Sequence, residues 1–599
     1  MGSRELTDEG FGQNDAFASL PVASLFEQAE QLRSSGQTAE AIALYKSWLS
    51  VAGRQDAHVV WFNLGSLLQA EGDLGGAIAS YQAALAVSPR FAHALINLGL
   101  ALERAGQTQK ALSAWSDVVA QRLLSEQTSN DLIVMALNHI GRVQENLKQY
   151  RLAENALAQS LQIDPRQPGV IQHLIHVRQK ACMWPVYRPM PSVSMNEMLL
   201  ATSPLAMLAM NDDPVQQLLV AQSFVNRTYP LQQERLYNAH RRVHSRLRIG
   251  YVSGDLCVHA VGLLLAELLE SHDRECVEIY GYDFSPEDKT PQRARLLKAF
   301  DHLRSIRHLD DRTAAQHIVD DEIDVLIDLH GLSHGARPGI FALRPARLQG
   351  AWLGFIGTTS MPWLDFVITD RNALPDATVP FFRERPLYVD GSFLPLSASA
   401  GDIQPINRAE IGLPENAFVM AAFGNVYKIT PEIFDRWLEI LKRAPNALLW
   451  LIDDNDTATR NLRDYTAAAG IDLKRVHFSP RTSLGSYRSY LKVADLFLDT
   501  WPYNCGSTTN DVLNAGLPIL TVGGRTMVSR MGTSMLSALK LDSLIAKNLQ
   551  DYEDRAVAFA EGKETLPIVD VRSMVSADHS KRLARSIERG LRDLIASGG

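Results

Sequence analysis

A 34-residue period near the start of the sequence constrains the fold more than any other feature. The same residue types return after one period with the same internal spacing, as Trp61, Leu64, Gly65, Gly72, Ala77 and Tyr81 are followed by Leu95, Leu98, Gly99, Gly106, Ala111 and Trp115. The spacing extends backward through Leu25, Ala29, Gly36, Ala41 and Tyr45, and forward, after an insertion near residues 122–132, through Leu137, Ile140, Gly141, Ala153, Leu157 and Pro165. This period predicts stacked helix pairs that cross at a small residue, because one pair cannot bury its apolar face alone.

These residues resemble the tetratricopeptide repeat, and about four repeats fill residues 22–168. The resemblance implies an α-solenoid with a concave groove, in which we expect a protein partner to dock. The alternative is a structural support or a dimerisation surface, so a homodimer remains open. Residues 169–245 continue with helical patterns and are not rich in Gly or Ser, which predicts a rigid helical connector rather than a flexible linker.

From Arg246 onward, short buried strands alternate with helices, which predicts doubly wound parallel sheets and an α + α/β fold class for the whole chain. We expect two Rossmann-like halves, at residues 246–395 and 409–565, with a short linker at 396–408 and a C-terminal helix within 566–599. Ligands of such sheets bind at the carboxyl ends of the strands. Polar residues gather at those ends and predict one cleft drawn from both halves: Ser253–His259, Asp328–Ser333, Asn425–Lys428, Ser479–Thr482 and Asn504–Asp511.

Charge, cysteine content and hydropathy exclude several classes of protein. The net charge of −8 gives no concentrated basic face for a nucleic acid. The four cysteines have no CxxC spacing, so we expect neither a disulfide framework nor a zinc site. The longest apolar run, Ala260–Leu269, is too short for a membrane span and contains Glu267. We therefore expect a cytoplasmic protein without a nucleic-acid or membrane partner.

The stretch "DLFLDTWPYNCGSTTNDVLNAGLP" (495–518) passes from a strand to a helix through Gly506, Ser507, Thr508 and Thr509. Free amides and the positive end of the helix dipole favour an anion there, and Gly506 lets the backbone approach it closely. The competing interpretation is that Ser and Thr only cap the helix. Lys428, just after a strand end of the same half, favours phosphate. No GxxxxGK[ST] or GxGxxG loop is present, which argues against a nucleoside triphosphatase and a dinucleotide enzyme.

Four long blocks within residues 246–560 resemble the O-linked N-acetylglucosamine transferase (SPINDLY-like) family: "RLRIGYVSGDLCVHAV", "GARPGIFALRPARLQGAWLGFIGTTSMPWLDFVITD", "FGNVYKITPEIFDRWLEILKRAPNALLWLI" and "LDTWPYNCGSTTNDVLNAGLPILTVGG". The stretch 396–408 is too short for the large insert of the animal members, so the likeness is to a bacterial member. The resemblance implies a GT-B fold, sugar transfer with inversion, no metal and no other cofactor. It implies a nucleotide sugar (UDP-N-acetylglucosamine, UDP-glucose or GDP-fucose) as donor and a protein side chain as acceptor.

Carried over residue by residue, the resemblance assigns Lys428 to the donor diphosphate, Ser507, Thr508 and Asp511 to the donor site, and His259 to the reacting centre. Three positions depart from the animal members. Asn425 replaces Gln, Gly506 replaces His, and Tyr487 replaces a base-stacking His, although an aromatic ring could still stack. These departures leave the sugar and the nucleobase of the donor open.

The residues themselves support a chemistry without metal. Lys428 and the amides of Ser507–Thr509 could stabilise the charge of a leaving diphosphate, whereas Asp454–Asp456 offers a DxD pattern that could instead bind Mg²⁺. His259 is the candidate base or a positioning residue for the acceptor. His330 is the second catalytic candidate, with a structural hydrogen bond as its alternative role, and His334 and Arg337 either contact the acceptor or only pack.

The sequence thus predicts a protein glycosyltransferase that moves a sugar, with UDP-N-acetylglucosamine as the leading donor, to Ser or Thr of a protein recruited by the repeats. The alternatives are UDP-glucose transfer to Asn, transfer of fucose from GDP-fucose or of another nucleotide-activated sugar to Ser or Thr of flagellin-like proteins, and a non-catalytic scaffold of repeats.

Overall fold

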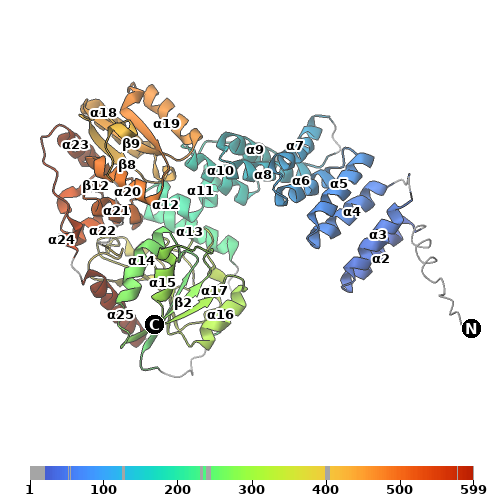
Figure 1. The fold of residues 1–599 in the computed structure, drawn as a ribbon, viewed down its shortest axis with the longest axis horizontal. Coiled ribbons are helices and arrows are strands. Elements are labelled where there is room, and N and C mark those ends of the chain that lie inside the picture. The colour runs from blue at the N-terminus through green and yellow to red at the C-terminus, as the bar shows by residue number, and fades with distance from the viewer. Residues whose placement is uncertain are drawn as a thin grey trace, which may run out of the picture. The chain divides into compact units, whose positions relative to one another are not determined.

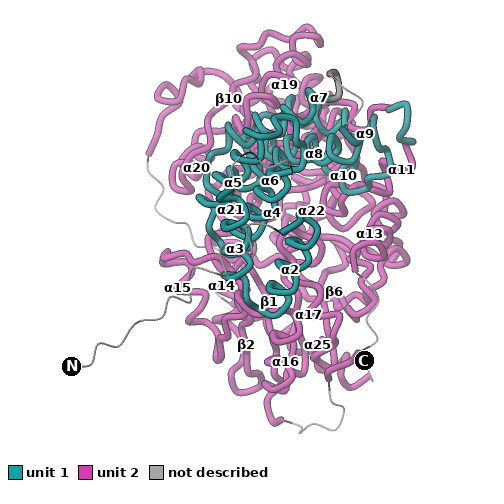
Figure 2. The backbone as a smooth tube through the Cα atoms, turned by 90° about the vertical axis from the view of Figure 1, so that its right-hand side faces the viewer, with its two compact units in different colours: residues 1–177, 190–194 teal, residues 178–189, 195–599 magenta. Residues whose placement is uncertain are grey.

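The protein divides into two compact units, one formed by residues 1–177 with 190–194 and the other by residues 178–189 with 195–599 (Figure 2). The computed structural model describes residues 20–51, 53, 56–124, 128–229, 234–237, 244–397, 405–575 and 578–597. Each unit has a hydrophobic core of its own. No helix among these residues combines the length and the apolar character needed to cross a bilayer.

The first unit is built from four consecutive helix pairs (Figure 1), which confirms the predicted repeats. Its helices are α2 (Val22–Ser34), α3 (Thr38–Leu49), α4 (Ala57–Ala70), α5 (Leu74–Val87), α6 (Ala92–Arg104), α7 (Thr108–Leu124), α8 (Asn130–Asn146) and α9 (Tyr150–Ile163), and α10 (Pro168–Lys180) follows.

Glycines allow the two helices of a pair to cross at close range. A Cβ atom on Gly65 would lie 2.7 Å from Cε1 of Tyr81, and one on Gly141 would lie 2.6 Å from Cδ2 of Leu157. A Cβ atom on Gly99 would overlap the indole ring of Trp115, which is fully buried. The small residue of one helix therefore accommodates the large residue of the next, as the 34-residue pattern predicts.

The second unit begins with the short helices α11 (Met195–Ala201), α12 (Pro204–Met210) and α13 (Pro214–Thr228) and continues with two α/β halves (Figure 1). The first half contains a seven-stranded parallel sheet of order β3-β2-β1-β4-β5-β6-β7. Its strands are β1 (Leu247–Ser253), β2 (Val277–Asp283), β3 (His302–Ser305), β4 (Val325–Asp328), β5 (Leu348–Ala351), β6 (Phe366–Thr369) and β7 (Arg385–Tyr388). Its helices are α14 (Ala260–Ser271), α15 (Pro291–Lys298), α16 (Asp311–Asp320), α17 (Pro338–Ala342) and the 3₁₀ turn η1 (Val379–Phe381).

The second half contains a six-stranded parallel sheet of order β10-β9-β8-β11-β12-β13. Its strands are β8 (Phe418–Ala422), β9 (Ala447–Asp453), β10 (Val476–Pro480), β11 (Leu496–Leu498), β12 (Ile519–Val522) and β13 (Ile545–Ala546). Its helices are α18 (Pro431–Arg443), α19 (Asp456–Ala468), α20 (Leu484–Val493), α21 (Ser507–Asn514), α22 (Met531–Ala538), α23 (Leu549–Ala560) and α24 (Val571–Met574), with 3₁₀ turns η2 (Ala409–Ile411), η3 (Val426–Lys428), η4 (Leu473–Arg475), η5 (Val528–Arg530) and η6 (Asp542–Leu544).

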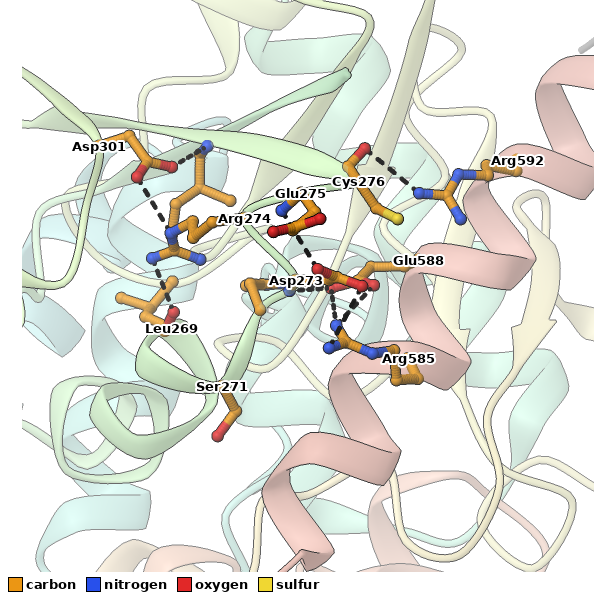
Figure 3. A network of polar contacts seen from close by, with 12 residues as sticks. Leu269, Ser271, Asp273, Arg274, Glu275, Cys276, Asp301, Arg585, Glu588 and Arg592 are labelled. Carbon is orange, nitrogen blue, oxygen red and sulfur yellow. Dashed lines mark hydrogen bonds and ion pairs between the residues drawn. The ribbon is translucent and has the colours of Figure 1, made fainter. Parts of the chain in front are cut away.

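The last helix, α25 (His579–Ala596), follows the second half in the chain but packs on α14 and β7 of the first half. A Cβ atom on its Gly590 would lie 2.8 Å from Cδ2 of Leu387, so the helix lies directly on the sheet. Polar contacts fix its other side to the turn between α14 and β2 (Figure 3), where Glu588 accepts from the Asp273 amide and Arg592 donates to the Cys276 carbonyl. The C-terminal helix therefore connects the end of the second half back to the first half.

Candidate active site

One cavity of about 580 Å³ lies between the two halves of the second unit. The first half contributes Asp255, His259, Ala260, Val261, Leu264, Ser333, His334, Leu353, Gly354, Ile356 and Leu394, and the second half contributes Phe423, Asn425, Tyr427, Lys428, Arg481, Tyr503, Gly506, Ser507, Thr508 and Met531. Leu205 of α12 completes the lining. Most of the polar lining residues follow strand ends or begin the next helix, so a cavity lies at the carboxyl ends of both sheets, where the cleft is predicted.

Lys428 contributes a primary amine to the polar wall of this cavity. It is the last residue of η3, and its Nζ donates to the carbonyl of Asn504 at 3.3 Å and lies 3.9 Å from the ring centroid of Tyr503. Burial lowers the pKa of Lys428, while the negative charge of nearby Asp499 opposes that shift. The ammonium group therefore has few compensating charges inside the protein and would gain from an anion in the cavity.

The N-terminus of α21 lies at the same wall. Its N-cap residue is Gly506, with no side-chain capping bond, and Ser507 and Thr508 are the first two helical residues. Their hydroxyls are therefore not the N-cap, which favours the anion-binding interpretation over simple capping. The amides of Thr509 and Asn510 donate to the Gly506 carbonyl, so the amides of Ser507 and Thr508 are the ones that present the positive end of the helix dipole to an anion.

The remaining predicted donor residues differ in their access to the cavity. Asn425 lines it and is exposed. Thr509 is buried, and its hydroxyl donates to the carbonyl of Cys505 at 2.7 Å, so it holds the turn that precedes α21. Tyr487 and Asp511 lie behind the lining: Tyr487 bonds to Thr508, and Asp511 accepts from Nε and Nη2 of Arg488 at 3.0 and 2.9 Å. Burial raises the pKa of Asp511, and the charge of Arg488 opposes that shift.

His259 faces the cavity from the first half. It is the N-cap of α14, and its side chain is about half exposed. Its Nδ1 accepts from the Val261 amide at 3.4 Å and lies 3.2 Å from Oδ2 of Asp255. When Nδ1 instead carries a proton, it donates to Asp255, and Nε2 then keeps the lone pair that an acceptor hydroxyl could use.

His330 makes a hydrogen bond to the loop between β1 and α14, which carries Asp255 and His259. It is buried, its Nε2 accepts from the Gly254 amide at 2.8 Å, and its Nδ1 lies 3.1 Å from the Ser333 hydroxyl. Burial lowers the pKa of His330, with a counteracting contribution from Asp255. Since Nε2 accepts, the imidazole is neutral and holds the loop that carries Asp255. His330 itself does not line the cavity, unlike His334.

Two other sequence candidates have structural partners. Asp454 forms an ion pair with Arg481, and Asn455 caps α19 through a bond from the Ala458 amide at 2.8 Å. The DxD pattern thus belongs to a helix start, and no group of three or more His, Cys, Asp or Glu side chains in the described part of the chain is arranged as a metal site. Arg337 donates to Asp311 and to the carbonyls of Ile306 and Leu309, so it packs within the first half.

Sequence reasoning assigned no role to two residues that the structure places at the cavity. Asp255 was only one of several polar residues after β1, yet it contacts both histidines. Arg481 was only one residue of the predicted strand end Ser479–Thr482. A sequence signal existed for each, since Arg481 directly follows β10 and Asp255 comes two residues after the end of β1. Their partners, however, lie 4 to 75 positions away and are visible only in the folded chain.

Comparisons with known proteins bear on the family and the fold of the chain. A model described as glycosyl transferase family 41 matches residues 222–396 and 397–584, and models of the tetratricopeptide repeat match residues 62–106 and 136–167. A solved structure of an O-GlcNAc transferase mutant from Thermobaculum terrenum shares 23% identity with a TM-score of 0.63 and covers 92% of this chain and 100% of its own. At that identity the likeness supports the fold, repeats followed by two facing Rossmann-like halves.

Two curated relatives carry the name UDP-N-acetylglucosamine–peptide N-acetylglucosaminyltransferase. The protein SEC of Arabidopsis thaliana, named as a probable one, is 33% identical over 328 residues, which are 54% of this chain and 34% of the relative. The protein of Caenorhabditis elegans is 26% identical over 425 residues, which are 52% of this chain and 37% of the relative. The chain therefore spans about a third of the length of these relatives.

Proposed function

Because the chain belongs to glycosyl transferase family 41, we propose that it transfers N-acetylglucosamine from UDP-N-acetylglucosamine to Ser or Thr hydroxyls of a protein. The observation that carries the proposal is the cavity, which joins Lys428 and the N-terminus of α21 on one side to the Asp255–His259 pair on the other. The names of the two curated relatives support the same donor.

In this proposal the diphosphate lies against Lys428 and the amides of Ser507 and Thr508. The acceptor oxygen forms a bond to the anomeric carbon from the face opposite the leaving group, the bond from that carbon to the phosphate oxygen breaks, and UDP leaves with the electron pair. The configuration at carbon is inverted. His259 Nε2 takes the proton of the acceptor hydroxyl as the new bond forms, and the carboxylate of Asp255 beside Nδ1 stabilises the imidazolium that results.

The protein needs no metal for the leaving group in this proposal. The ammonium group of Lys428 and the amides at the start of α21 stabilise the negative charge that develops on the diphosphate. These groups are already in place before the reaction. The repeats of the first unit supply the second part of the proposal, because stacked repeats form an extended surface suited to binding the acceptor protein.

Thermal melting of the purified protein with UDP, GDP or CMP, each with and without EDTA, tests the donor. A ligand that binds only the folded state raises the melting temperature by mass action. We expect a rise with UDP that EDTA leaves unchanged, and UDP-N-acetylglucosamine should then label an acceptor protein, with the mass increase located on Ser or Thr. A rise with GDP or CMP alone would overturn the donor, label on Asn would overturn the acceptor, and no rise at all would favour the scaffold of repeats.

Lys428→Ala tests the assigned role of the amine. Since Lys428 meets charge that grows in the transition state, kcat should fall at least ~10²-fold, the scale of losing one preorganised donor. Lys442→Ala is a matched control, because Lys442 is an exposed lysine of α18 that pairs with Glu439 and does not line the cavity. Turnover of UDP-N-acetylglucosamine measures both, and an unchanged kcat for Lys428→Ala would remove this residue from the reaction.

A further inference from the structure

Arg481 lines the cavity but has no part in the site described so far. It follows β10 directly, and 57% of its side chain is exposed. Its Nε is paired with Asp454, of which only 17% is exposed, so the carboxylate anchors the base of the guanidinium. In the part of the chain that the structure describes, Nη1 and Nη2 of Arg481 donate to no protein atom. The ion pair therefore fixes the orientation of the guanidinium group, while the two terminal nitrogens can donate hydrogen bonds to a ligand.

The place of Arg481 along the cavity follows from its neighbours. Arg481–Ser483 connects β10 to α20, and α20 carries Tyr487 and Arg488. These two residues contact Thr508 and Asp511 of α21, so the loop leads into a helix that packs on α21, whose N-terminus is the proposed diphosphate site. The loop therefore lies on the second-half side of the cavity, beside α20 and α21.

A nucleotide sugar is a chain of sugar, diphosphate, ribose and base in that order. With the diphosphate at Lys428 and α21, the sugar must reach the first half, because His259 and Asp255 contribute to the cavity from there. The nucleoside then extends the other way, into the second half and toward the loop that carries Arg481. The base is the part of the donor that remains for Nη1 and Nη2 to contact.

We propose that Arg481 recognises the nucleobase of the donor and selects uracil over cytosine. The inference rests on the proposed function and adds to it a residue that determines the donor. A guanidinium group only donates hydrogen bonds. Uracil presents a carbonyl oxygen at the position where cytosine presents an amino group. With cytosine, a guanidinium donor would therefore face an amino donor, and both groups would be left without a hydrogen-bond acceptor. Guanine also offers acceptors to an arginine, so the comparison between the two pyrimidines is the diagnostic one.

Arg481→Met tests this selection, because Met keeps an unbranched apolar stem but has no donors. Affinities of UDP and CDP are measured by titration calorimetry for the full-length protein and for the variant. The unmodified protein should bind UDP about 10-fold more tightly than CDP, the scale of one good base contact. In Arg481→Met the UDP affinity should fall toward that of CDP, while the CDP affinity stays within about 2-fold, since one base contact is all that Met removes.

Arg463→Met is the matched control. Arg463 is an exposed arginine of α19 that lies over Phe478 and does not line the cavity, so the variant should keep the preference for UDP. An equal loss of UDP and CDP affinity in Arg481→Met would show a phosphate contact and overturn the inference. An unchanged ratio would overturn it as well. If the unmodified protein binds neither nucleotide, the proposed function itself fails, which these titrations distinguish from a loss of selectivity.

Discussion

Asp255 lies between two histidines of the first half, 3.2 Å from His259 Nδ1 and 3.4 Å from His330 Nε2. Asp255→Asn keeps the size but removes the charge that favours a proton on Nδ1 of His259. We expect kcat to fall at least ~10-fold, a part of the ~10²–10⁴ that a positioned acid or base supplies, with little change in the donor KM. Asp288→Asn is the control, because Asp288 accepts from the Val258 amide of the same loop without contacting either histidine. Equal kcat values in all three proteins would contradict the role of Asp255.

Asp328 makes the stability of the second unit depend on pH. It is buried at the end of β4, and burial raises its pKa to about 7, although amides of His330 and Gly331 oppose the shift. A carboxyl whose pKa is raised in the folded state stabilises the fold below its ordinary pKa, and this contribution is lost as the pH rises from about 4 to about 7.

As the pH rises from 4.5 to 7.5, the free energy of unfolding should therefore fall less in Asp328→Asn than in the unmodified protein. Urea unfolding at both pH values, monitored through a spectroscopic signal from the second unit, measures this difference in the free energy of unfolding. Asp320→Asn, which changes an exposed carboxylate of α16, should keep the full pH dependence. An identical pH dependence in Asp328→Asn would show that Asp328 is already ionised in the folded protein at low pH.

The sequence predicted the location of the site better than its contacts. Lys428, Ser507 and His259 were expected together because each follows a strand end or starts a helix, and parallel strands end at one edge. The structure brings these three to one cavity. The pairing of Asp511 with Arg488 and of Arg481 with Asp454 was not foreseen, because a side-chain partner depends on rotamer and neighbouring element rather than on spacing.

At the scale of elements, β3 (sequence HLRS) and β13 (sequence IA) carry no strand signal in the sequence. All four residues of β3 are exposed, and β13 has only two residues, so neither carries the apolar run that indicates a buried strand. Both lie at an edge of their sheet, where one side of the strand has no partner strand. The strand order therefore required the folded structure, although the fold class did not.

Helix α25 depends on one buried carboxylate, that of Glu588. It accepts from Nδ1 of His272 at 2.8 Å. It also accepts from the Asp273 amide at 3.0 Å and pairs with Arg585, which is about half exposed (Figure 3). Burial alone would raise the pKa of Glu588, but the bonds from His272 and Asp273 lower it overall, so the group is charged and satisfied.

Glu588→Ala would leave these buried donors without an acceptor. The free energy of unfolding should fall by about 3–5 kcal/mol, the cost of breaking a buried pair. Glu588→Gln keeps an acceptor and should cost less. Arg592→Ala removes only a bond to the Cys276 carbonyl from an exposed position and serves as the control. Denaturant unfolding measures all three, and equal midpoints for Glu588→Ala and Arg592→Ala would show that α25 is held mainly by its apolar face.

At the scale of the whole molecule, two separate cores predict two unfolding transitions rather than one. Scanning calorimetry should resolve them, and UDP should raise only the transition of the second unit, because the cavity lies there. Gly99→Ala should lower only the other transition, because a Cβ atom would overlap Trp115 in the core of the repeats, a strain of about 1–3 kcal/mol. A single transition that UDP and Gly99→Ala both move would show that the repeats and the catalytic halves unfold as one cooperative body.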